Sequence, residues 1–373
     1  MRKIAVFFGG KSCENEISIL TGLFVMNVLD RTKYEIFPVY IDTDGKTYTS
    51  PSMTNIDAFR DKDCSRFERI FFEQGGMYAF NEKKKRIKRI AKPDCALNCC
   101  HGGLGEGGGV SALAAWNNIP LASPDLTSSG VFMDKCATKL FLRALNVPIV
   151  DYIRVNEADY QKRGAFLLKS IESRLKYPVV VKPAHLGSSI GIATAENEEE
   201  AKRAIEQAFA LDDRVIVEKF LRDKKDVNCA AYSIDGEIYV SEAEESFGAG
   251  LYTFEEKYVN RDRETPLSPK TGGIKPLVGE LRDKIRAYTK TVYKRMDLKG
   301  VVRMDFLVSD GKAYLCEVNA VPGSLAYYLF CERISDARTF FGDLIEDAIN
   351  RGAAADKSVP TTGILHTVRW RRK

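Results

Sequence analysis

The sequence predicts a protein of mixed α/β and α+β class with three domains. Three observations favour this organisation: an apolar strand near the N-terminus that runs through glycines into a helix, a central lysine that enters a loop of glycines and serines, and a pair of alternating strands near the C-terminus. The chain has 373 residues, enough for two or three domains that each bury a core. With 45% hydrophobic and 29% charged residues, it has the composition of a folded globular protein rather than a disordered one.

The first expected domain, residues 1–124, opens with a strand that ends at Gly9-Gly10 and a helix over residues 18–29. Short apolar runs predict buried strands at residues 4–8, 39–41 and 95–98. This order indicates a small doubly wound domain, whose ligands bind at the carboxyl ends of the strands. Two glycine-rich stretches, after residues 8 and 101, follow such strand ends.

The second expected domain, residues 125–221, combines a hairpin, helices and a further strand. Its first helix covers residues 135–146, and its apolar face is expected to consist of Cys136, Leu140, Phe141, Ala144 and Leu145. Asn197, followed three residues later by Glu200, is an N-cap signature that opens another helix. A strand at 215–217 completes the domain.

The most informative segment is residues 179–192. A β-branched run carries Lys182 into a loop of small residues that includes Ser188 and Ser189. Glycines let backbone N–H groups approach an anion, the hydroxyls add donors, and the lysine adds positive charge, as a polyphosphate requires. A P-loop has its lysine after the glycines and continues into a helix, whereas here Ile190 and Ile192 predict a second strand. This order favours an ATP-grasp nucleotide site, and the alternative is a plain hairpin with a solvent-facing lysine.

The third expected domain, residues 222–373, contains a stretch rich in glycine and proline at 246–276, which we interpret as a lid over a site. A helix follows at about 277–295. Two alternating strands are then expected at 301–308 and 313–319.

The strand pair near the C-terminus presents a polar face. If its turn is a three-residue loop, Asp305 faces Glu317 and Arg303 faces Asn319, and all four side chains lie on one side of the sheet. Two carboxylates and an amide oxygen suit Mg²⁺. The alternative is a solvent-facing ladder of ion pairs. The metal site is favoured because the chain continues into Val321-Pro322-Gly323, a turn whose backbone N–H groups could meet a substrate.

Charge and cysteine content exclude several classes of protein. The 56 basic and 51 acidic residues give a net charge of +5, which indicates no general affinity for nucleic acid or membranes. The basic runs at 83–89 and 369–373 are expected to be a solvated turn or helix face and a frayed terminus. Nine scattered cysteines predict reduced thiols in a cytoplasmic protein, and Cys99-Cys100-His101 has no second cluster to complete a metal site.

Eight segments, in this order, resemble one enzyme family over nearly the whole chain. They are Gly9 to Ser18, His101 to Glu106, Met133-Asp134-Lys135, Lys182 to Gly191, Glu218 to Leu221, Glu256-Lys257-Tyr258, Arg303-Met304-Asp305 and Glu317 to Gly323. Together they are similar to the D-alanine:D-alanine ligases, three-domain ATP-grasp enzymes whose N-terminal domain is a doubly wound pre-ATP-grasp domain. The match departs from the family at Gly107-Gly108-Gly109, where an aspartate is usual after the glutamate.

The resemblance implies residues that bind ATP and metal. The phosphates would meet Lys135, Lys182, Ser188 and Ser189, and the adenine pocket would contain Glu218, Lys219 and Leu221. Asp226 would replace the glutamate that binds the ribose. Asp305, Glu317 and Asn319 would hold two Mg²⁺ ions, with Mn²⁺ as an alternative.

It also implies the substrate and catalytic residues. Glu14 would anchor the substrate ammonium, although Glu14 beside Glu16 could also be an exposed loop acid. Other expected contacts with the substrates are His101, Lys257 and either Ser324 or Tyr328; Tyr328 stands where the family has the serine that holds the second carboxylate. Ser188 and Tyr258 would position the second substrate, and Arg303 with the N–H of Gly323 would form the oxyanion site.

The expected reaction is ATP-dependent ligation of two D-alanines through an acyl phosphate, which gives a peptidoglycan precursor. The enzyme is expected to be cytoplasmic, and the resemblance implies a homodimer. One alternative is a related ligase that joins D-alanine to another small amino or hydroxy acid. Another is a non-catalytic nucleotide-binding paralogue. An NAD-linked oxidoreductase is disfavoured because Gly9-Gly10 lacks the G-x-G-x-x-G spacing.

Overall fold

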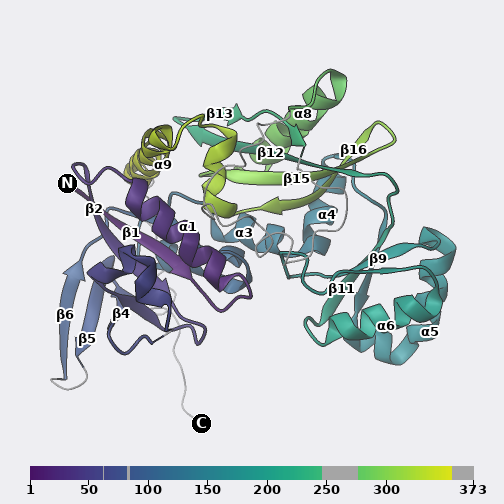
Figure 1. Cartoon of the computed structure of the whole chain (residues 1–373), viewed down its shortest axis with the longest axis horizontal. Coiled ribbons are helices and arrows are strands. Elements are labelled where there is room, and N and C mark those ends of the chain that lie inside the picture. The colour runs from purple at the N-terminus through teal and green to yellow at the C-terminus, as the bar shows by residue number, and fades with distance from the viewer. Residues whose placement is uncertain (62, 82–84, 246–275, 355–373) are drawn as a thin grey trace, which may run out of the picture.

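The structure is a computed structural model that describes residues 1–61, 63–81, 85–245 and 276–354. The predicted lid, with Lys257 and Tyr258, lies outside these residues except for Pro276. Three separate sheets of seven, four and five strands organise the described chain (Figure 1). They confirm the mixed α/β and α+β class, while the exact domain boundaries stay a prediction.

The N-terminal sheet is mixed, in the order β6-β5-β4-β3-β2-β1-β7. The predicted parallel strands are β1 (Arg2–Gly9), β2 (Tyr34–Ile41) and β7 (Cys95–Asn98). Apolar residues 4–8 of β1 are fully buried, as expected for a strand covered on both faces. Helix α1 (Asn15–Val28) follows β1, and α2 (Val110–Trp116) follows β7 after a π-helical turn, η3 (Gly105–Gly109).

Antiparallel strands that the sequence analysis did not predict extend this sheet (Figure 1). They are β3 (Thr47–Thr49), β4 (Glu68–Glu73), β5 (Gly76–Asn81) and β6 (Arg86–Ala91), with short helical turns η1 (Pro51–Thr54) and η2 (Ile56–Phe59) between β3 and β4. The prediction of a turn or helix face at 83–89 is therefore wrong for its second half, which belongs to the edge strand β6. The residues from Arg86 to Arg89 are exposed, so the expected solvation is confirmed there.

The central sheet has the order β10-β9-β11-β8, and all its pairs are antiparallel. Its strands are β8 (Tyr152–Asn156), β9 (Val179–Pro183), β10 (Ala193–Ala195) and β11 (Arg214–Lys219), and its helices are α5 (Glu157–Leu175) and α6 (Glu198–Phe209). Apolar side chains of β9 and β11 pack in one core with both helices. The predicted N-cap is confirmed, because Asn197 Oδ1 accepts the N–H of Glu200 at 3.0 Å.

The second strand of the predicted hairpin begins at Ala193 rather than at Ile190. Ser188, Ser189 and Gly191 have positive φ angles, so the chain between them turns instead of extending. The loop after Lys182 is therefore longer than the sequence indicated. Through Leu186 and Ser188 this loop contacts the neighbouring elements, namely α4 (Lys135–Ala144) and the start of α1.

The third sheet contains β12 (Lys225–Ile234), β13 (Glu237–Val240), β15 (Val302–Ser309) and β16 (Lys312–Asn319), with the short β14 (Glu244–Glu245) paired to β12. Helix α8 (Glu280–Arg295) packs on this sheet. The helices α3 (Leu126–Met133) and α4 (Lys135–Ala144) also contact it, although the sequence analysis assigned both to the second domain.

The predicted face of α4 is wrong in part. Leu140 and Ala144 are exposed, whereas Lys139 and Leu142 are completely buried. Cys136 packs with Ala184 and Ile216 of the central domain, while Leu142 belongs to the core under β15 and β16. The helix is covered on one side by the central domain and on another by the core under β15 and β16. Its solvent-exposed face is therefore narrower than that of a helix packed on a single sheet.

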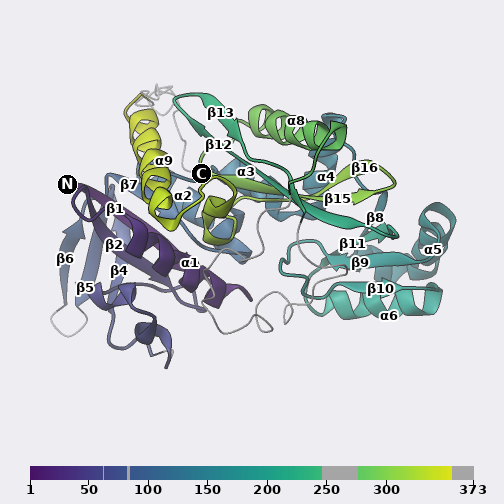
Figure 2. The ribbon, with the colours of Figure 1, turned by 45° about the horizontal axis from the view of Figure 1, so that its top comes forward.

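The last segment that the structure describes returns to the N-terminal domain. After the turn η4 (Gly323–Leu329), helix α9 (Ile334–Ala354) contacts α1 and β7 (Figure 2). Tyr327 and Phe341 pack in one core with Phe24 of α1. The first domain and the segment formed by η4 and α9 are thus joined by a shared core.

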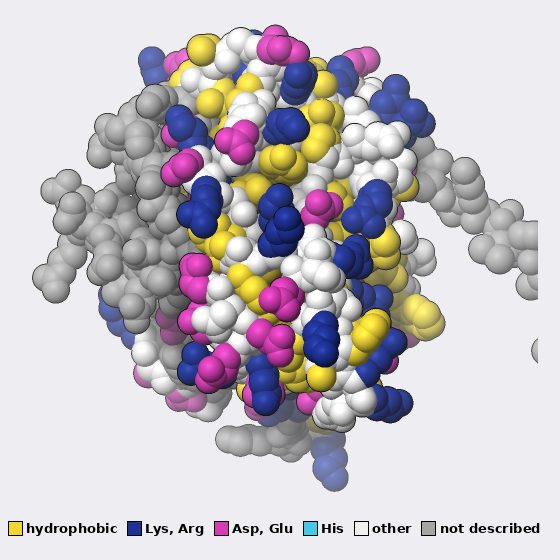
Figure 3. Space-filling view, turned by 90° about the vertical axis from the view of Figure 1, so that its right-hand side faces the viewer, with side chains coloured by type: hydrophobic (Ala, Val, Ile, Leu, Met, Phe, Trp, Pro, Cys, Tyr) yellow, Lys and Arg dark blue, Asp and Glu magenta, His cyan; other side chains and the backbone are white. Residues whose placement is uncertain are grey.

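One face of the described molecule carries mixed charge. On the described part of the face that contains α5 and α6, basic and acidic side chains are interspersed (Figure 3). None of the described helices has the length and apolar character needed to cross a membrane. All nine cysteines lie in the described chain as free thiols, as predicted.

Candidate active site

Several predicted site residues, among them Glu14, His101 and Ser188, lie where the carboxyl ends of β1 and β7 meet the loop after β9 and the turn after β16. Gly9 ends β1, and the chain then reaches Glu14 at the start of α1. The hydroxyl of Ser188, in the loop of the central domain, donates a hydrogen bond to Oε1 of Glu14. This contact joins two domains, so Glu14 is not simply an exposed loop acid.

Two glycines make room for the Glu14 carboxylate. A Cβ atom on Gly187 would lie 2.8 Å from its Oε2 atom, and one on Gly102 would lie closer still. Gly102 also has a φ angle of +66°, which a larger residue adopts only with strain. The glycine loops after residues 101 and 182 therefore enclose the carboxylate that the resemblance assigns to the substrate ammonium.

His101 connects the second glycine loop to the turn after β16. Its Nδ1 atom lies 2.7 Å from the carbonyl oxygen of Val321, so Nδ1 carries the proton in this hydrogen bond. Its Nε2 atom lies 2.7 Å from the hydroxyl of Thr21, which also accepts the N–H of Ser324 at 3.2 Å. Burial lowers the pKa of His101 to about 4, so the ring is neutral at pH 7. Both ring nitrogens are used to hold this turn.

Glu106 supports the same turn. Its carboxylate accepts the N–H of Gly102 at 2.7 Å and the N–H of Val321 at 3.2 Å. Burial raises its pKa to about 7. The unusual glycines at 107–109 lie in η3, where Gly108 has a φ angle of +111° and lies close to Leu126 of α3.

The pairing predicted for the polar face of the strand pair, now β15 and β16, is present. Arg303 pairs with Asn319 and Asp305 with Glu317. The premise for it, a three-residue loop, is wrong: Ser309 pairs with Lys312, so the loop has two residues, and the register shifts by one between Asp305 and Phe306. This β-bulge leaves Cys316 without a partner in the ladder and restores the predicted pairs.

Arg303, Asp305 and Asn319 form a hydrogen-bonded group on this face. The guanidinium of Arg303 donates to both carboxylate oxygens of Asp305, at 2.7 and 2.8 Å, and Asn319 Nδ2 donates to Oδ2 of Asp305 at 3.0 Å. Arg303 also donates to the hydroxyl of Tyr328 at 3.1 Å. The carboxylates of Asp305 and Glu317 and the amide of Asn319 are hard oxygen donors on one face, a set that fits Mg²⁺.

The lysines expected to bind phosphate lie on two elements. Lys135, the first residue of α4, donates to the carbonyl oxygen of Leu186 at 2.5 Å and so contacts the loop after β9. Lys182 is 7% exposed, and its Nζ atom lies 2.7 Å from Oε2 of Glu218. Burial raises the pKa of Glu218, but the charges of Lys139 and Lys182 outweigh it and lower this pKa to about 2.

The other expected nucleotide residues follow Glu218 along the chain. Lys219 ends β11, and Leu221 lies in the connection to β12. Asp226, near the start of β12, forms an ion pair with Lys224 at 3.0 Å. Ser189 lies beside Ser188 in the loop after β9 and has a φ angle of +61°.

Sequence reasoning missed Lys139 and His185. Lys139 is a buried partner of Glu218, and its position four residues after Lys135 on one helix face was the available signal. His185 hydrogen-bonds Asp212 at 3.0 Å, with its other nitrogen 3.6 Å from Asp134, which forms an ion pair with Arg214. Asp134 also caps α4 by accepting the N–H of Cys136 at 2.7 Å. No sequence pattern predicts a contact between the segments that contain Asp134, His185 and Asp212.

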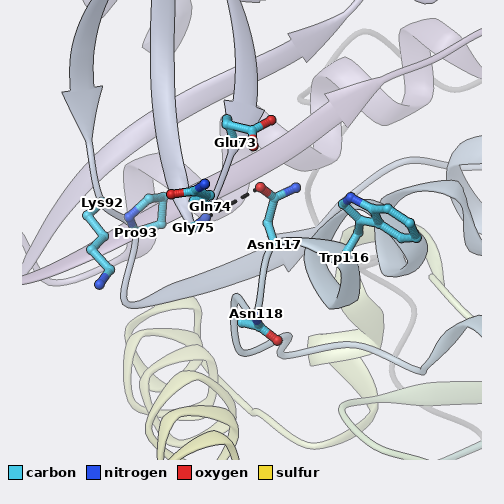
Figure 4. A pocket seen from close by; sticks show the side chains of 8 residues that line it. All are labelled: Glu73, Gln74, Gly75, Lys92, Pro93, Trp116, Asn117 and Asn118. Carbon is cyan, nitrogen blue, oxygen red and sulfur yellow. Dashed lines mark hydrogen bonds between the residues drawn. The ribbon is translucent and has the colours of Figure 1, made fainter. Parts of the chain in front are cut away.

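A separate pocket of about 390 Å³ lies between the β4–β5 turn and the end of α2 (Figure 4). It is lined by Glu73, Gln74, Gly75, Lys92, Pro93, Trp116, Asn117 and Asn118. None of these residues belongs to the predicted site. Within it, Asn117 accepts the N–H of Gly75, and Trp116 points away from Lys92 (Figure 4).

Comparison with known proteins finds one family. Residues 3–124 match the family model of the D-ala D-ala ligase N-terminus, and residues 141–350 match that of the C-terminus. The chain is 35% identical over 339 residues to the D-alanine--D-alanine ligase of Thermosipho africanus, covering 88% of each. The solved D-alanine-D-alanine ligase from Coxiella burnetii is 25% identical with a TM-score of 0.76, covering 95% of this chain and 97% of that one. The VanG D-Ala:D-Ser ligase from Enterococcus faecalis is also 25% identical, with a TM-score of 0.70, and the match covers 94% of this chain and 99% of that one.

Proposed function

Because this chain belongs to the D-alanine–D-alanine ligase family, we propose that it joins two D-alanine molecules at the expense of ATP, giving D-alanyl-D-alanine for peptidoglycan synthesis. The observation that carries the proposal is the contact between Glu14 and Ser188, which joins the substrate loop of the first domain to the phosphate loop of the second. The contact supports the proposal because it places the residue proposed to hold the amino acid beside the loop proposed to hold the phosphates.

In the proposed reaction, Glu14 holds the ammonium group of the first D-alanine. A carboxylate oxygen of this substrate attacks the γ-phosphorus, ADP leaves, and an acyl phosphate forms. Lys135 and Lys182 hold the phosphates by charge and hydrogen bonds. Mg²⁺ held by Asp305, Glu317 and Asn319 would supply neutralisation of phosphate charge.

The amine of the second substrate then attacks the acyl carbon, and phosphate leaves after a tetrahedral intermediate. Arg303 and the N–H of Gly323 stabilise the oxyanion of this intermediate. Asp305 supports this role, because its bidentate contact fixes the plane of the Arg303 guanidinium. The roles of Lys257 and Tyr258 remain those that the resemblance implies, since both lie outside the described chain.

The second candidate function is a related ligase that joins D-alanine to another small amino or hydroxy acid. The observation that favours it is Tyr328, whose hydroxyl is held by Arg303 at 3.1 Å where the family has a serine. A phenol fills more space than a serine hydroxyl, and Ser324 is the alternative donor. The match to a D-Ala:D-Ser ligase supports this candidate, because that protein has a similar fold and is named for a different second substrate.

The residues of the site disfavour a non-catalytic paralogue. The five residues that phosphoryl transfer needs are retained, namely Lys135, Lys182, Asp305, Glu317 and Asn319. We further propose that the enzyme works in the cytoplasm, as a homodimer, with two Mg²⁺ ions that Mn²⁺ can replace. The domain boundaries at 124 and 221 belong to the same proposal.

Phosphate release from ATP, measured over a panel of acids, tests the proposed function. We expect release only with D-alanine present, with D-serine and D-lactate compared as second substrates at fixed D-alanine. Tyr328→Phe should change the preference among second substrates and leave the KM for ATP unchanged. If D-alanine is by far the best second substrate and Tyr328→Phe changes nothing, the altered second site is wrong. Phosphate release that no D-amino acid stimulates would contradict ligation itself.

A further inference from the structure

Three buried charged side chains meet beneath the phosphate loop: Lys139 of α4, Lys182 of β9 and Glu218 of β11. Lys139 Nζ lies 2.8 Å from Oε1 of Glu218, and Lys182 Nζ lies 2.7 Å from Oε2 of the same carboxylate. The side chains of Lys139, Lys182 and Glu218 are 0%, 9% and 3% exposed. One carboxylate is thus shared by two ammonium groups, with one ammonium on each oxygen.

The charges of this group do not cancel. Within this group of three, two positive charges and one negative charge leave a surplus of one positive charge. The carboxylate of Glu317 also acts on Lys182, but in the proposed site its charge is taken up by Mg²⁺. A buried charge without a partner is costly, so the surplus favours the binding of an anion. The ring of Tyr152, whose centroid is 5.6 Å from Lys139 Nζ, compensates only part of it.

The position of each lysine decides where that anion can bind. Lys139 is completely buried. Lys182 is the member with a partly exposed side chain, it also lies 3.6 Å from Cys316 Sγ on the bulged strand, and its strand leads into the phosphate loop. An anion can therefore reach the group through Lys182 and not through Lys139.

We propose that Lys139 is a positioning residue for the nucleotide phosphates. It supplies the charge that balances Glu218, so that the charge of Lys182 stays available to a phosphate. Without Lys139, Lys182 and Glu218 form a closed neutral pair that attracts an anion much less. The inference rests on the proposed function, because it takes the anion to be the phosphate chain of ATP.

The test compares the affinities for ADP and for adenosine, because only ADP carries phosphates. Isothermal titration calorimetry on the full chain gives both affinities at a fixed Mg²⁺ concentration. Lys139→Met keeps the length of the side chain and removes its charge. It should weaken ADP binding about tenfold, the size of one lost charge-assisted contact, and change adenosine binding less than about twofold.

Three further variants separate this role from a merely structural one. Lys139→Arg keeps the charge and should keep most of the preference for ADP over adenosine. The double variant Lys139→Met/Glu218→Gln removes both charges and should restore the preference lost in Lys139→Met, because Lys182 is again unpaired. Arg143→Met is the matched control: Arg143 is an exposed cation of the same helix, also stacked on Tyr152, and its loss should leave the preference unchanged.

The outcomes are distinguishable. Equal loss of ADP and adenosine binding in Lys139→Met, or no recovery in the double variant, would overturn the inference while the nucleotide site stands. If Lys139→Met does not fold, Glu218→Gln decides: the preference of this variant for ADP should rise at least about threefold, and a fall would overturn the inference. A wild-type protein that binds neither ADP nor adenosine would contradict the proposed function, and the inference with it.

Discussion

Glu317 offers the most direct test of the proposed Mg²⁺ site on β15 and β16. It pairs with Asp305 across two strands, and removal of its carboxylate deletes a metal ligand where phosphate charge accumulates. Glu317→Ala should lower kcat by about two orders of magnitude or more, the usual scale for loss of one strong electrostatic contact at a reacting centre. Steady-state ADP formation as a function of Mg²⁺ concentration measures the effect.

The corresponding change at Asp305 has an additional consequence. Asp305→Ala also removes the bidentate partner of Arg303, so both turnover and thermal stability should fall, whereas Glu317→Ala should lower turnover with a folded protein. Circular dichroism gives the control for folding. Near-wild-type turnover in both variants would contradict the proposal that Asp305 and Glu317 bind Mg²⁺.

Lys182 provides the second prediction at this scale. Lys182→Ala should raise the KM for ATP and lower kcat, because a desolvated contact between lysine and phosphate is a strong charge-assisted hydrogen bond. The variant should still fold, since Glu218 keeps Lys139 as a partner at 2.8 Å. If the dependence of the rate on ATP concentration is unchanged, Lys182 does not bind phosphate, and the alternative of a plain hairpin is supported.

At the scale of elements, His185 holds together the start of the phosphate loop, the connection before β11 and the first turn of α4. The neighbouring carboxylates of Asp134 and Asp212 raise the pKa of His185 to about 9, above its ordinary value of 6.5. Burial raises the pKa of Asp134, but its hydrogen bonds with His185 and with the amides of α4 outweigh this and lower it. Both groups are therefore charged at pH 7.

The direction of each pKa shift fixes the dependence on pH. A raised pKa makes His185 stabilise the fold fully below about pH 6.5, and this contribution is lost as the pH rises through about 9. His185→Asn should thus destabilise the protein at pH 6 and have little effect at pH 10. Since the side chain is 36% exposed and solvent screens it, we expect at most about 1 kcal/mol in the free energy of unfolding. Urea titrations at the two pH values measure it, and an equal effect at both would contradict the role of the charge.

Elements with a local signal could be predicted from the sequence, and those fixed by tertiary contacts could not. The Asn197 cap is a local signal, and helix α6 begins where it predicts. The bulge at Cys316 has no such signal, so the correct pairing of Asp305 with Glu317 was predicted from a loop one residue too long. The exposure of Leu140 was missed because a hydrophobic pattern does not reveal that a helix is covered by two domains.

At the scale of the whole molecule, the site is assembled by segments that are distant in the sequence. The resemblance to a family brought Glu14, Ser188 and Arg303 together as candidates, and the structure gives Glu14 and Ser188 a direct hydrogen bond. The network from His101 through Thr21 to Ser324 was not predicted, because it depends on the return of the chain to α1 after β16. Long-range packing of this kind leaves no periodic pattern in a single sequence.

The fate of the carboxylate oxygen tests the central claim, ligation through an acyl phosphate, most directly. The enzyme is incubated with ATP, Mg²⁺ and D-alanine labelled with ¹⁸O in its carboxylate, and the products are analysed by mass spectrometry. If the carboxylate attacks the γ-phosphorus and the amine then breaks the acyl carbon–oxygen bond, each released phosphate carries one ¹⁸O atom and each phosphate accompanies one dipeptide. Dipeptide formed with unlabelled phosphate, or ATP consumed without dipeptide, would contradict the account.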